Sequence, residues 1–332
     1  MPDVMPVPHM QPYVLSADGP QLVTLAAPVP ASHELLVRVR AAALNRVDLA
    51  MSRGHVHGNA GGIGNVLGLE CAGEVLACGD AVTAFAPGAR VMCSGAGAFA
   101  ELMAVDAGRA LPIPEGMDWE QAAALPVALQ TMHDALATNG VLQPGQAVLI
   151  QGASSAVGLM GLQLAKLLGA RWVAGSSTDP QRRARLGEFG ADLAVDSSDP
   201  QWVQQVLEAT QGQGVDLLVD QVAGPLLNQN LRATRILGRI VNVGRLGGQR
   251  GEMDFDLHAL RRISYVGVTF RTRSRAEVLQ IVAKVRAELS EALRQGRLRM
   301  PVDRVFAFRE LHAALAHMQA NRHFGKIALR LG

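Results

Sequence analysis

Residues 148–169, VLIQGASSAVGLMGLQLAKLLG, constrain the fold of this chain more than any other segment. The apolar start at 148–150 predicts a buried parallel strand, and the apolar spacing from Leu159 to Leu168 predicts an amphipathic helix. A turn of small residues, GASSAVG at 152–158, joins the two. Such a unit directs backbone N–H groups and the positive helix end at one point, which suits a pyrophosphate. The segment therefore predicts a dinucleotide-binding α/β domain.

The glycine fingerprint of such turns is altered in this chain. Ala153, Ser155 and Gly158 stand at its three glycine positions. For this segment alone, an ordinary strand-to-helix turn remains the alternative interpretation.

The next expected strand, residues 172–174, bears on which cofactor binds. It ends in Gly175-Ser176-Ser177-Thr178, without the Asp or Glu that binds adenosine ribose hydroxyls, and Arg182, Arg183 and Arg185 follow. A carboxylate would repel a 2′-phosphate, whereas hydroxyls and a guanidinium bind one. We therefore expect NADPH, with Arg182 on the phosphate because it lies nearest the strand end. A solvated helix face is the alternative for these arginines.

Length and composition indicate two domains without nucleic-acid or membrane partners. The 332 residues suffice for two cores, and the formal net charge is +2. No apolar run is long enough to span a bilayer, and residues 1–4 lack the pattern of a secretory signal. Cys71, Cys78 and Cys93 form no CxxC pair, which favours a reducing compartment. We expect a cytoplasmic enzyme.

The chain divides into a β-rich part and an alternating part. Up to residue 118 the pattern is strand-like, with Gly-rich turns such as that at 94–97. Beyond it, helices separate most of the expected strands, which lie at 147–151, 172–174, 193–195, 217–219, 239–243 and 265–269. This alternation predicts an α/β fold with a doubly wound parallel sheet at 119–269.

After Phe270 the pattern predicts a helix at 275–295, another at 308–319 and a closing strand at 326–331. These elements are too few to fold alone. We therefore expect residues 270–332 to complete the domain formed by residues 1–118. The active site is then expected in the cleft between this domain and the α/β domain.

Five motifs follow one another along nearly the whole chain. They are ALNRVD at 43–48, LGLECAG at 67–73, AAALP at 122–126 with Thr131, the GASSAVG turn, and HFGKI at 323–327. In this order they resemble the medium-chain dehydrogenase/reductase superfamily, in its zinc-free quinone oxidoreductase (zeta-crystallin-like) branch. The resemblance implies a GroES-like β-barrel domain, a Rossmann domain, NADPH as hydride donor and a homodimer.

The zinc alcohol dehydrogenases of this superfamily are similar but differ at their metal ligands. They have Cys where Asn45 stands and Gly-His-Glu where Gly68-Leu69-Glu70 stands. Leu69 cannot ligate a metal, and no loop carries four clustered cysteines for a structural zinc. His55 and His57 are the remaining candidate ligands, and solvent exposure is the favoured interpretation for both. We expect no metal.

The resemblance also implies site residues. Asn45 matches an Asn beside the nicotinamide and the substrate, where its amide can donate to a developing oxyanion. Thr131 matches a residue near the nicotinamide carboxamide, and these two are the expected catalytic residues. The further cofactor-binding residues are Ser155, Ala156 and Val157 for the pyrophosphate, Gly175, Ser176 and Arg182 for the adenosine phosphate, and Val243, Gly244, Arg245, Phe270 and Lys326. The alternatives are a loop-pinning Asn45, a core aromatic at 270 and a solvated Lys326.

The proton donor is left open by a departure from the family pattern. Relatives have a Tyr shortly after the Asn-Arg-x-Asp motif, and Val56 stands there in this chain. His55, His57 and His133 are candidate donors, with loop or helix-face positions as the alternative. A quinone could instead take its proton from water. The Gly-rich loop at 55–65 is expected to form a mobile lid.

The leading hypothesis is a metal-free, NADPH-dependent oxidoreductase that transfers hydride to a quinone or another conjugated carbonyl. The first alternative is an enone or enoyl-thioester reductase, with Arg271, Arg273 and Arg275 as a basic rim or as a solvated helix start. The second is an NADPH-responsive, non-catalytic binding protein, although near-neutral charge argues against nucleic-acid recognition. The apolar strand at 264–269 is expected to be a sheet edge that pairs across a homodimer.

Overall fold

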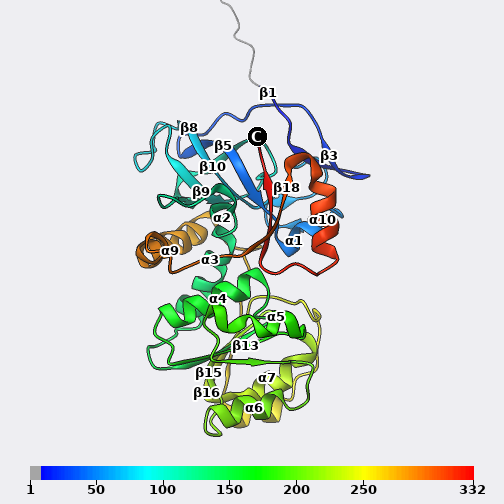
Figure 1. Ribbon diagram of the computed structural model, residues 1–332, viewed down its shortest axis with the longest axis vertical. Coiled ribbons are helices and arrows are strands. Elements are labelled where there is room, and N and C mark those ends of the chain that lie inside the picture. Colours follow the sequence, from blue (N-terminus) through cyan, green and yellow to red (C-terminus); the bar gives the residue numbers. More distant parts are fainter. Residues whose placement is uncertain (1–8) are drawn as a thin grey trace, which may run out of the picture. The chain divides into compact units, whose positions relative to one another are not determined.

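The computed structural model describes residues 9–332, which fall into two compact units (Figure 1). Unit 1 ends its first segment at Val127 and resumes with Phe270–Gly332, and unit 2 is Ala128–Thr269. Residues 1–4, on which the expectation about a secretory signal rests, lie outside the described residues. Helix α2 (Trp119–Ala123) packs with unit 1, so this unit extends beyond the expected boundary at residue 118.

The main sheet of unit 1 combines strands from both of its segments. Its order is β11-β9-β8-β5-β19-β18, and β10 also pairs with β5. The closing strand β19 (Lys326–Arg330) runs antiparallel to β5, so the end of the chain completes the N-terminal sheet, as expected. The other strands of this sheet are β5 (Glu34–Ala43), β8 (Glu70–Cys78), β9 (Arg90–Ser94), β10 (Leu102–Asp106), β11 (Ala110–Pro112) and β18 (Val302–Ala307).

Every second side chain along the first half of β5 lies in the core of unit 1. Leu35, Val37 and Val39 point to one face and are buried, because successive strand side chains alternate between faces. Helix α10 contributes Leu311 and Met318 to the same core. The helices of this unit are α1 (Arg46–Met51), α2, α9 (Arg275–Arg294) and α10 (Leu311–Gln319), and α3 (Pro126–His133) begins in it.

Three two-stranded sheets accompany this sheet. They pair β1 (His9–Met10) with β4 (Leu25–Ala26), β2 (Tyr13–Ser16) with β3 (Gly19–Leu22), and β6 (Val56–His57) with β7 (Ala60–Gly61). The last of these occupies the segment expected as a lid. There His57 pairs with Ala60, and the Asn65 side chain donates to the Gly61 carbonyl at 2.8 Å.

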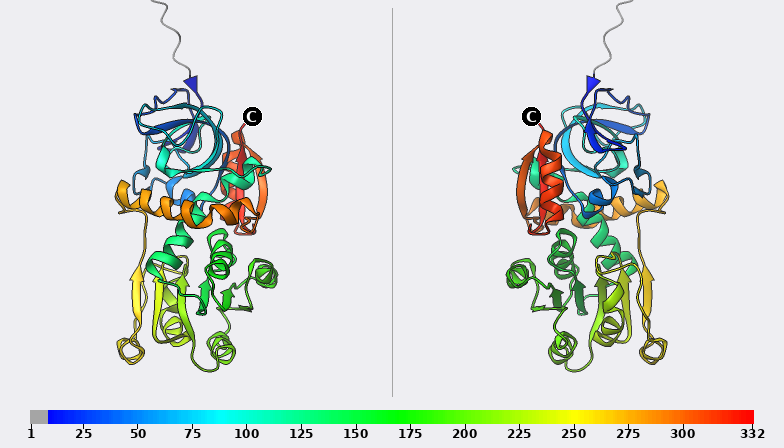
Figure 2. Two further views of the ribbon diagram at one scale, coloured as in Figure 1. Left: turned by 90° about the vertical axis from the view of Figure 1, so that its left-hand side faces the viewer. Right: turned by 90° about the vertical axis from the view of Figure 1, so that its right-hand side faces the viewer.

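Unit 2 is a six-stranded sheet in which every pairing is parallel. The order β14-β13-β12-β15-β16-β17 reverses at β12, whose neighbours are β13 and β15. Helices α4 and α5 lie on one face of the sheet, and α6 and α7 lie on the other (Figures 1 and 2). The doubly wound sheet is therefore confirmed. Its strands are β12 (Ala147–Gln151), β13 (Trp172–Ser176), β14 (Leu193–Val195), β15 (Val215–Asp220), β16 (Thr234–Asn242) and β17 (Ser264–Gly267).

The crossover helices of unit 2 follow each strand in turn. They are α4 (Ala156–Leu167), α5 (Pro180–Ala184), α6 (Trp202–Ala209), α7 (Leu227–Ala233) and α8 (Phe255–Arg261). Within residues 9–332, no helix is both long enough and apolar enough to cross a membrane.

Candidate functional site

Asn45 caps the start of helix α1, and Leu44 separates it from the end of strand β5. The Asn45 backbone is extended (φ −118°, ψ 153°), as is usual for the residue that caps a helix. The Asn45 backbone N–H donates to Asp48 Oδ2 at 2.6 Å, the contact that an acidic residue makes from the third helical position. The ALNRVD motif therefore fixes the Asn45 backbone through local capping.

The sheet order brings two charged side chains to Asn45. Glu70 is the first residue of β8 and Lys326 is the first residue of β19, and both strands flank β5. Because both run antiparallel to β5, their first residues lie at the end where β5 leads into Asn45. Three segments far apart in sequence thus form one cluster.

The contacts within this cluster are direct hydrogen bonds. Lys326 Nζ donates to Asn45 Oδ1 at 2.6 Å and also bonds to Glu70 Oε1. Asn45 Nδ2 donates to the same Glu70 oxygen at 2.9 Å. The Glu70 and Lys326 side chains are 0% and 2% exposed, so the ion pair is enclosed. We name Asn45, Asp48, Glu70 and Lys326 the Asn45 cluster.

Two further contacts of the cluster are made to backbone atoms. Glu70 Oε2 accepts the Val127 N–H at 2.8 Å, and Lys326 Nζ lies 3.4 Å from the Leu44 carbonyl oxygen. Burial raises the pKa of Asp48 to about 7, against the lowering effects of its Asn45 hydrogen bond and of Lys326. Its second oxygen, Oδ1, is buried and has no hydrogen-bond partner within residues 9–332.

Lys326 was expected to line the cofactor site, with a solvated side chain as the alternative. The solvated alternative is wrong, because the side chain is buried and bonded within the cluster. Contact with a cofactor stays a prediction. The sequence analysis did not foresee Glu70 or Asp48 as partners. Their positions inside the two motifs around Asn45 and Gly68 were the available signal.

The turn at the start of α4 carries the expected pyrophosphate residues. Ser155 caps this 12-residue helix, and its Oγ accepts the Gly158 N–H at 3.0 Å. The N–H groups of Ala156 and Val157 lie in the first turn, where a helix offers no internal acceptor. A Cβ on Gly158 would lie 2.5 Å from the Gly152 oxygen, so this glycine allows the helix to approach the turn.

The end of β13 packs against this turn. Gly175 allows the approach, since a Cβ there would lie 2.8 Å from the Ala153 Cβ. Ser176 is buried, and its hydroxyl donates to Gln151 Oε1 at 2.5 Å and accepts the Gly152 N–H at 2.9 Å. Both hydrogen bonds of this hydroxyl thus hold the turn, and its predicted contact with a phosphate stays a prediction.

The three arginines after β13 have different surroundings. Arg182 is half-buried, and its Nε lies 3.6 Å from Asp179 Oδ2. Arg183 Nη1 donates to Asp196 Oδ2 at 2.9 Å and to the Ser177 carbonyl at 2.8 Å. Arg185 pairs with Glu188 at the surface. Each of the three arginines therefore lies near a carboxylate, at 3.6, 2.9 and 3.1 Å for Arg182, Arg183 and Arg185.

A glutamine that was not predicted from the sequence bonds both to Ser155, at the start of α4, and to Gln151, at the end of β12. Gln221 follows β15, and Ser155 Oγ donates to its Oε1 at 3.0 Å. Its Nε2 donates to the Gln151 carbonyl at 3.1 Å. A Cβ on Gly244 would lie 2.7 Å from the Gln221 oxygen, so the segment after β16 also passes close by. The position directly after a parallel strand was the available signal.

The other expected residues lie as follows. Val243 and Gly244 direct their N–H groups to the Asp220 carbonyl, and Arg245 Nη1 lies 3.5 Å from the Val268 carbonyl. Thr131 is half-buried in α3. Phe270 opens the second segment of unit 1, with the Arg273 guanidinium 5.9 Å from its ring.

The structure thus groups the expected residues within each unit. Asn45 and Lys326 meet in unit 1, to which Phe270 also belongs. The expected residues near β12, β13 and β16 lie at or just after the carboxyl ends of these parallel strands in unit 2, where open α/β sheets bind ligands.

The candidate proton donors occupy three different environments. His55 is exposed, and its Nδ1 lies 3.1 Å from the Ala50 carbonyl oxygen. His57 is half-buried, and burial together with nearby Arg271 lowers its pKa. His133 is fully buried in α3. Val56, at the position of the family Tyr, is 63% exposed.

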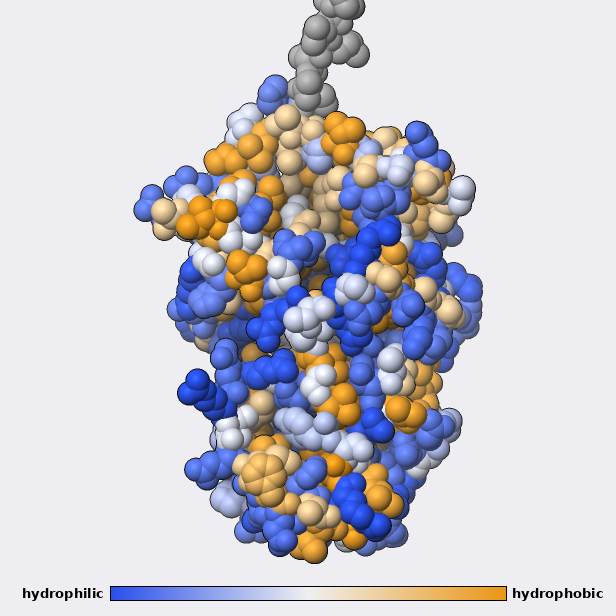
Figure 3. All heavy atoms as spheres, turned by 180° about the vertical axis from the view of Figure 1, so that it is seen from behind, coloured by the Kyte–Doolittle hydropathy of each residue, from blue (hydrophilic) through white to orange (hydrophobic). Residues whose placement is uncertain are grey.

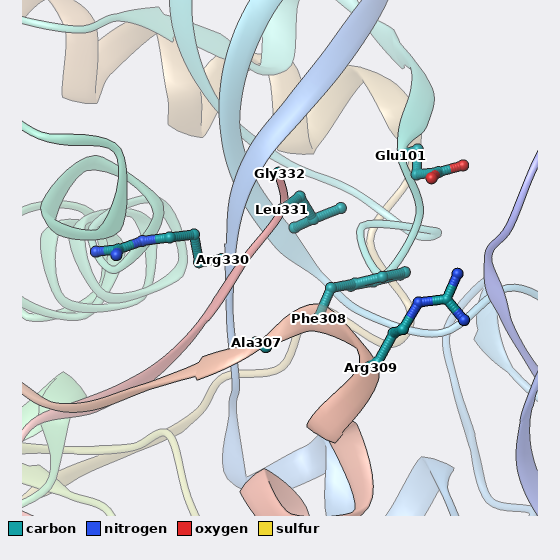
Figure 4. Close-up of a pocket in the computed structure, with 7 residues that line it drawn as sticks. All are labelled: Glu101, Ala307, Phe308, Arg309, Arg330, Leu331 and Gly332. Atoms are coloured by element: carbon teal, nitrogen blue, oxygen red, sulfur yellow. The ribbon is translucent and has the colours of Figure 1, made fainter.

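A separate cavity of about 280 Å³ lies in unit 1 (Figure 4). Its charged lining residues are already engaged, since Arg309 donates to Gln11 and Arg330 donates to Glu120. None of the expected site residues lines it. The lining consists of Glu101, Ala307, Phe308, Arg309, Arg330, Leu331 and Gly332.

Two family models match the chain. Residues 31–115 match "Alcohol dehydrogenase GroES-like domain", and residues 156–284 match "Zinc-binding dehydrogenase". Among curated relatives, a reducing polyketide synthase of Cochliobolus heterostrophus is 32% identical over 301 residues, which is 89% of this chain and 12% of the relative. The chain therefore spans about an eighth of that relative.

Solved structures match over nearly the whole chain. An alcohol dehydrogenase superfamily protein from Novosphingobium aromaticivorans has a TM-score of 0.88 and 28% identity, covering 98% of this chain and 100% of that one. A quinone oxidoreductase of Pseudomonas syringae has a TM-score of 0.85 and 25% identity, with coverages of 98% and 100%.

Proposed function

Because the chain belongs to the medium-chain dehydrogenase/reductase superfamily and is an oxidoreductase of that family, we propose that it is an NADPH-dependent, zinc-free reductase of an enone or an enoyl thioester. The observation that carries the proposal is the Asn45 carboxamide. Within residues 9–332, its Nδ2 makes one hydrogen bond, to Glu70, although the group has two hydrogens. The second N–H is available to the oxygen on which charge develops during reduction.

The residues present do not fit a catalytic zinc. The family description implies the metal, but Leu69 is apolar and both polar atoms of the Asn45 carboxamide are bonded to charged side chains. The Lys326 ammonium beside them would repel a cation. Within residues 9–332, no three His, Cys, Asp or Glu side chains form a group that could hold a metal ion. We therefore propose that hydrogen bonds alone polarise the substrate carbonyl.

The residues present do fit a dinucleotide. The Ala156 and Val157 N–H groups and the positive end of α4 suit a pyrophosphate, and Gly158 lets them come close to the turn. Arg182 would bind the 2′-phosphate, since it is the first arginine after the end of β13. Bound NADPH supplies the hydride that, with a proton, saturates the conjugated C=C bond.

The likeness to a reducing polyketide synthase supports an unsaturated acyl thioester as substrate. The basic rim expected for such a ligand is weaker than the sequence alone indicates. Arg275 pairs with Asp106, and Arg273 lies 3.7 Å from Glu277, so carboxylates offset two of its three charges. Arg271 is exposed.

A quinone is the second candidate substrate, supported by the likeness to the Pseudomonas syringae quinone oxidoreductase. The same Asn45 N–H would then bond to a quinone oxygen. This proposal needs no proton donor in the protein, because the reduced quinone can take its proton from water.

The test compares acceptors and cofactors in the metal-free protein. NADPH and NADH oxidation are followed with a 2-enoyl thioester, a small enone and an ortho-quinone, for the wild type and for Asn45→Ala. We expect NADPH-selective turnover of the enone or thioester, reduced about tenfold or more in Asn45→Ala. Turnover of the quinone alone would favour the second candidate. Equal turnover in Asn45→Ala would contradict the proposed role of Asn45.

We further propose that the protein is a homodimer that pairs through β17. This strand ends the sheet of unit 2 and bonds to β16 on one side. Apolar residues lie at the surface of the molecule (Figure 3). The exposed ones of this unit include Tyr265, Phe255 and Leu260. Exposed sheet edges and apolar patches are usually covered by a partner.

A further inference from the structure

We propose that Glu70 and Lys326 are positioning residues that fix the orientation of the Asn45 carboxamide, so that it presents an N–H and not its oxygen to the substrate. The inference rests on the proposed function and deepens it. It assigns these two side chains a role that acts through Asn45, without contact to the substrate.

The chemistry of the two partners dictates which way the amide faces. A lysine ammonium has only donors and a carboxylate has only acceptors. Lys326 therefore faces the amide oxygen, at 2.6 Å, and Glu70 faces the amide nitrogen, at 2.9 Å. A carboxamide rotated by 180° would set its oxygen against the carboxylate and its N–H against the ammonium. Both hydrogen bonds would be lost in an enclosed site, where unpaired polar groups are costly.

Every donor on Lys326 is already used. The ammonium has three hydrogens and three oxygen partners: Glu70 Oε1, Asn45 Oδ1 and the Leu44 carbonyl. A direct bond from Lys326 to a ligand would break one of these contacts. The Lys326 side chain is also only 2% exposed, so a ligand would have to displace protein atoms to reach it. Lys326 therefore acts through Asn45.

The backbone of Asn45 also holds the amide in place. The Asn45 N–H donates to Asp48 Oδ2 at 2.6 Å, so the backbone of Asn45 is fixed as well as its side chain. Glu70 is fixed in turn, because its second oxygen accepts the Val127 N–H at 2.8 Å. The amide is thus held at its nitrogen, its oxygen and its backbone, and the second Nδ2 hydrogen keeps one direction. A fixed donor of this kind selects ligands with an acceptor oxygen.

The test is a double-mutant cycle with Asn45→Ala and Lys326→Met. If Lys326 acts through Asn45, each single substitution lowers kcat for the unsaturated carbonyl by about tenfold or more, the loss expected for one oriented donor. In Asn45→Ala, the added Lys326→Met then changes kcat less than about twofold, because no amide remains to be oriented. The KM for NADPH stays within about twofold throughout. Lys166→Met, which removes a surface partner of Asp192, is the control and leaves kcat unchanged.

A second variant tests whether a low kcat results from loss of folding. Lys326→Met with Glu70→Gln removes the ion pair together, so no buried charge is left unpaired, and Gln still has an oxygen for the Val127 N–H. Urea unfolding and NADPH binding report whether the variant is folded. We expect a folded protein with low kcat, because neutral Met and Gln no longer dictate which side of the amide faces the substrate. Lys326→Arg keeps donors at this position and should recover part of the activity.

A spectroscopic readout does not depend on turnover. In protein labelled with ¹⁵N-Asn, the Asn45 side-chain signals are assigned by their absence in Asn45→Ala. One Nδ2 proton should lie downfield through its bond to the carboxylate, and the shift should disappear in Glu70→Gln. Unchanged Asn45 signals in that variant would contradict the proposal.

Different outcomes would overturn the proposed function of Asn45 and the positioning role of Lys326. If Asn45→Ala retains full activity, the proposed function of Asn45 is wrong. If Asn45→Ala is impaired and Lys326→Met lowers kcat by a further tenfold in the same protein, Asn45 keeps its role. The positioning inference is then overturned, because Lys326 must act on the ligand by another route.

Discussion

Lys326 and Glu70 form an ion pair between two strands that begin 256 residues apart in the sequence, with both side chains almost fully buried. Strand β19 places the ammonium and strand β8 places the carboxylate, on either side of β5. The pair therefore forms only when the end of the chain has docked on the N-terminal sheet. This relationship links the stability of unit 1 to the geometry at Asn45.

The first prediction concerns the energetics of this pair. Lys326→Met should destabilise the protein by about 3–5 kcal/mol, because it leaves the Glu70 carboxylate buried without its counter-ion. Lys326→Met combined with Glu70→Gln should recover most of that loss, since no uncompensated charge remains. Urea unfolding of the single and double variants measures both values. Equal destabilisation of the single and double variants would contradict the prediction.

The second prediction concerns Asp48 and pH. Burial raises its pKa from 3.8 in the unfolded chain to about 7. Between these values the unfolded state gives up a proton that the folded state keeps, so rising pH favours unfolding. The contribution of Asp48 to the free energy of unfolding is thus fully present below about pH 4 and is lost as pH rises through 7. The free energy of unfolding falls over this range with a slope approaching about 1.4 kcal/mol per pH unit.

Asp48→Asn tests this dependence, because Asn keeps an oxygen for the Asn45 N–H but does not titrate. Relative to the wild type, the variant should gain stability from pH 4.5 to pH 7 and little more above it. Urea unfolding at pH 4.5, 6 and 8 gives the difference. A constant difference would show that Asp48 does not titrate in this range, and a difference that shrinks as pH rises would contradict the raised pKa.

The third prediction concerns cofactor selectivity. Arg182→Ala should raise the KM for NADPH about tenfold or more and leave that for NADH nearly unchanged, because the lost contact is a charge-assisted bond to a group that NADH lacks. Arg185→Ala is the control, since Arg185 pairs with Glu188 at the surface. If Arg183→Ala raises the KM for NADPH and Arg182→Ala does not, the phosphate is bound by the neighbouring arginine.

The bounds of a strand in unit 2 could be predicted closely where the whole strand is buried and apolar. Strand β12 has the expected bounds, Ala147–Gln151, because all five residues are buried and its apolar run leaves no ambiguity. Strand β16 begins at Thr234, well before the expected residue 239. Its early part pairs Thr234 with Val215 across an irregularity in register, and the exposed Ile236 and Leu237 gave no period-2 pattern to recognise.

The site was less predictable, because its contacts depend on sheet register. The motifs pointed to Asn45 and Lys326 separately, but their meeting requires β8 and β19 to flank β5 with their first residues at one end. Local sequence does not encode that arrangement. Ser176 illustrates the same limit, since local sequence does not show that its buried hydroxyl bonds to Gln151.

The last prediction concerns association through unit 2. If a second copy covers β17 and α8, the wild type should have the mass of a dimer in light scattering at micromolar concentration. Phe255→Glu with Leu260→Glu should weaken the dimer at least about tenfold, because two charges would enter an apolar interface. These side chains are 73% and 68% exposed within one chain, so the fold itself should tolerate the change. Val29→Glu alters an 85% exposed apolar residue of unit 1 and should leave the mass unchanged. A monomeric wild type would contradict the proposed homodimer, and a double variant that dimerises as before would place the partner surface elsewhere.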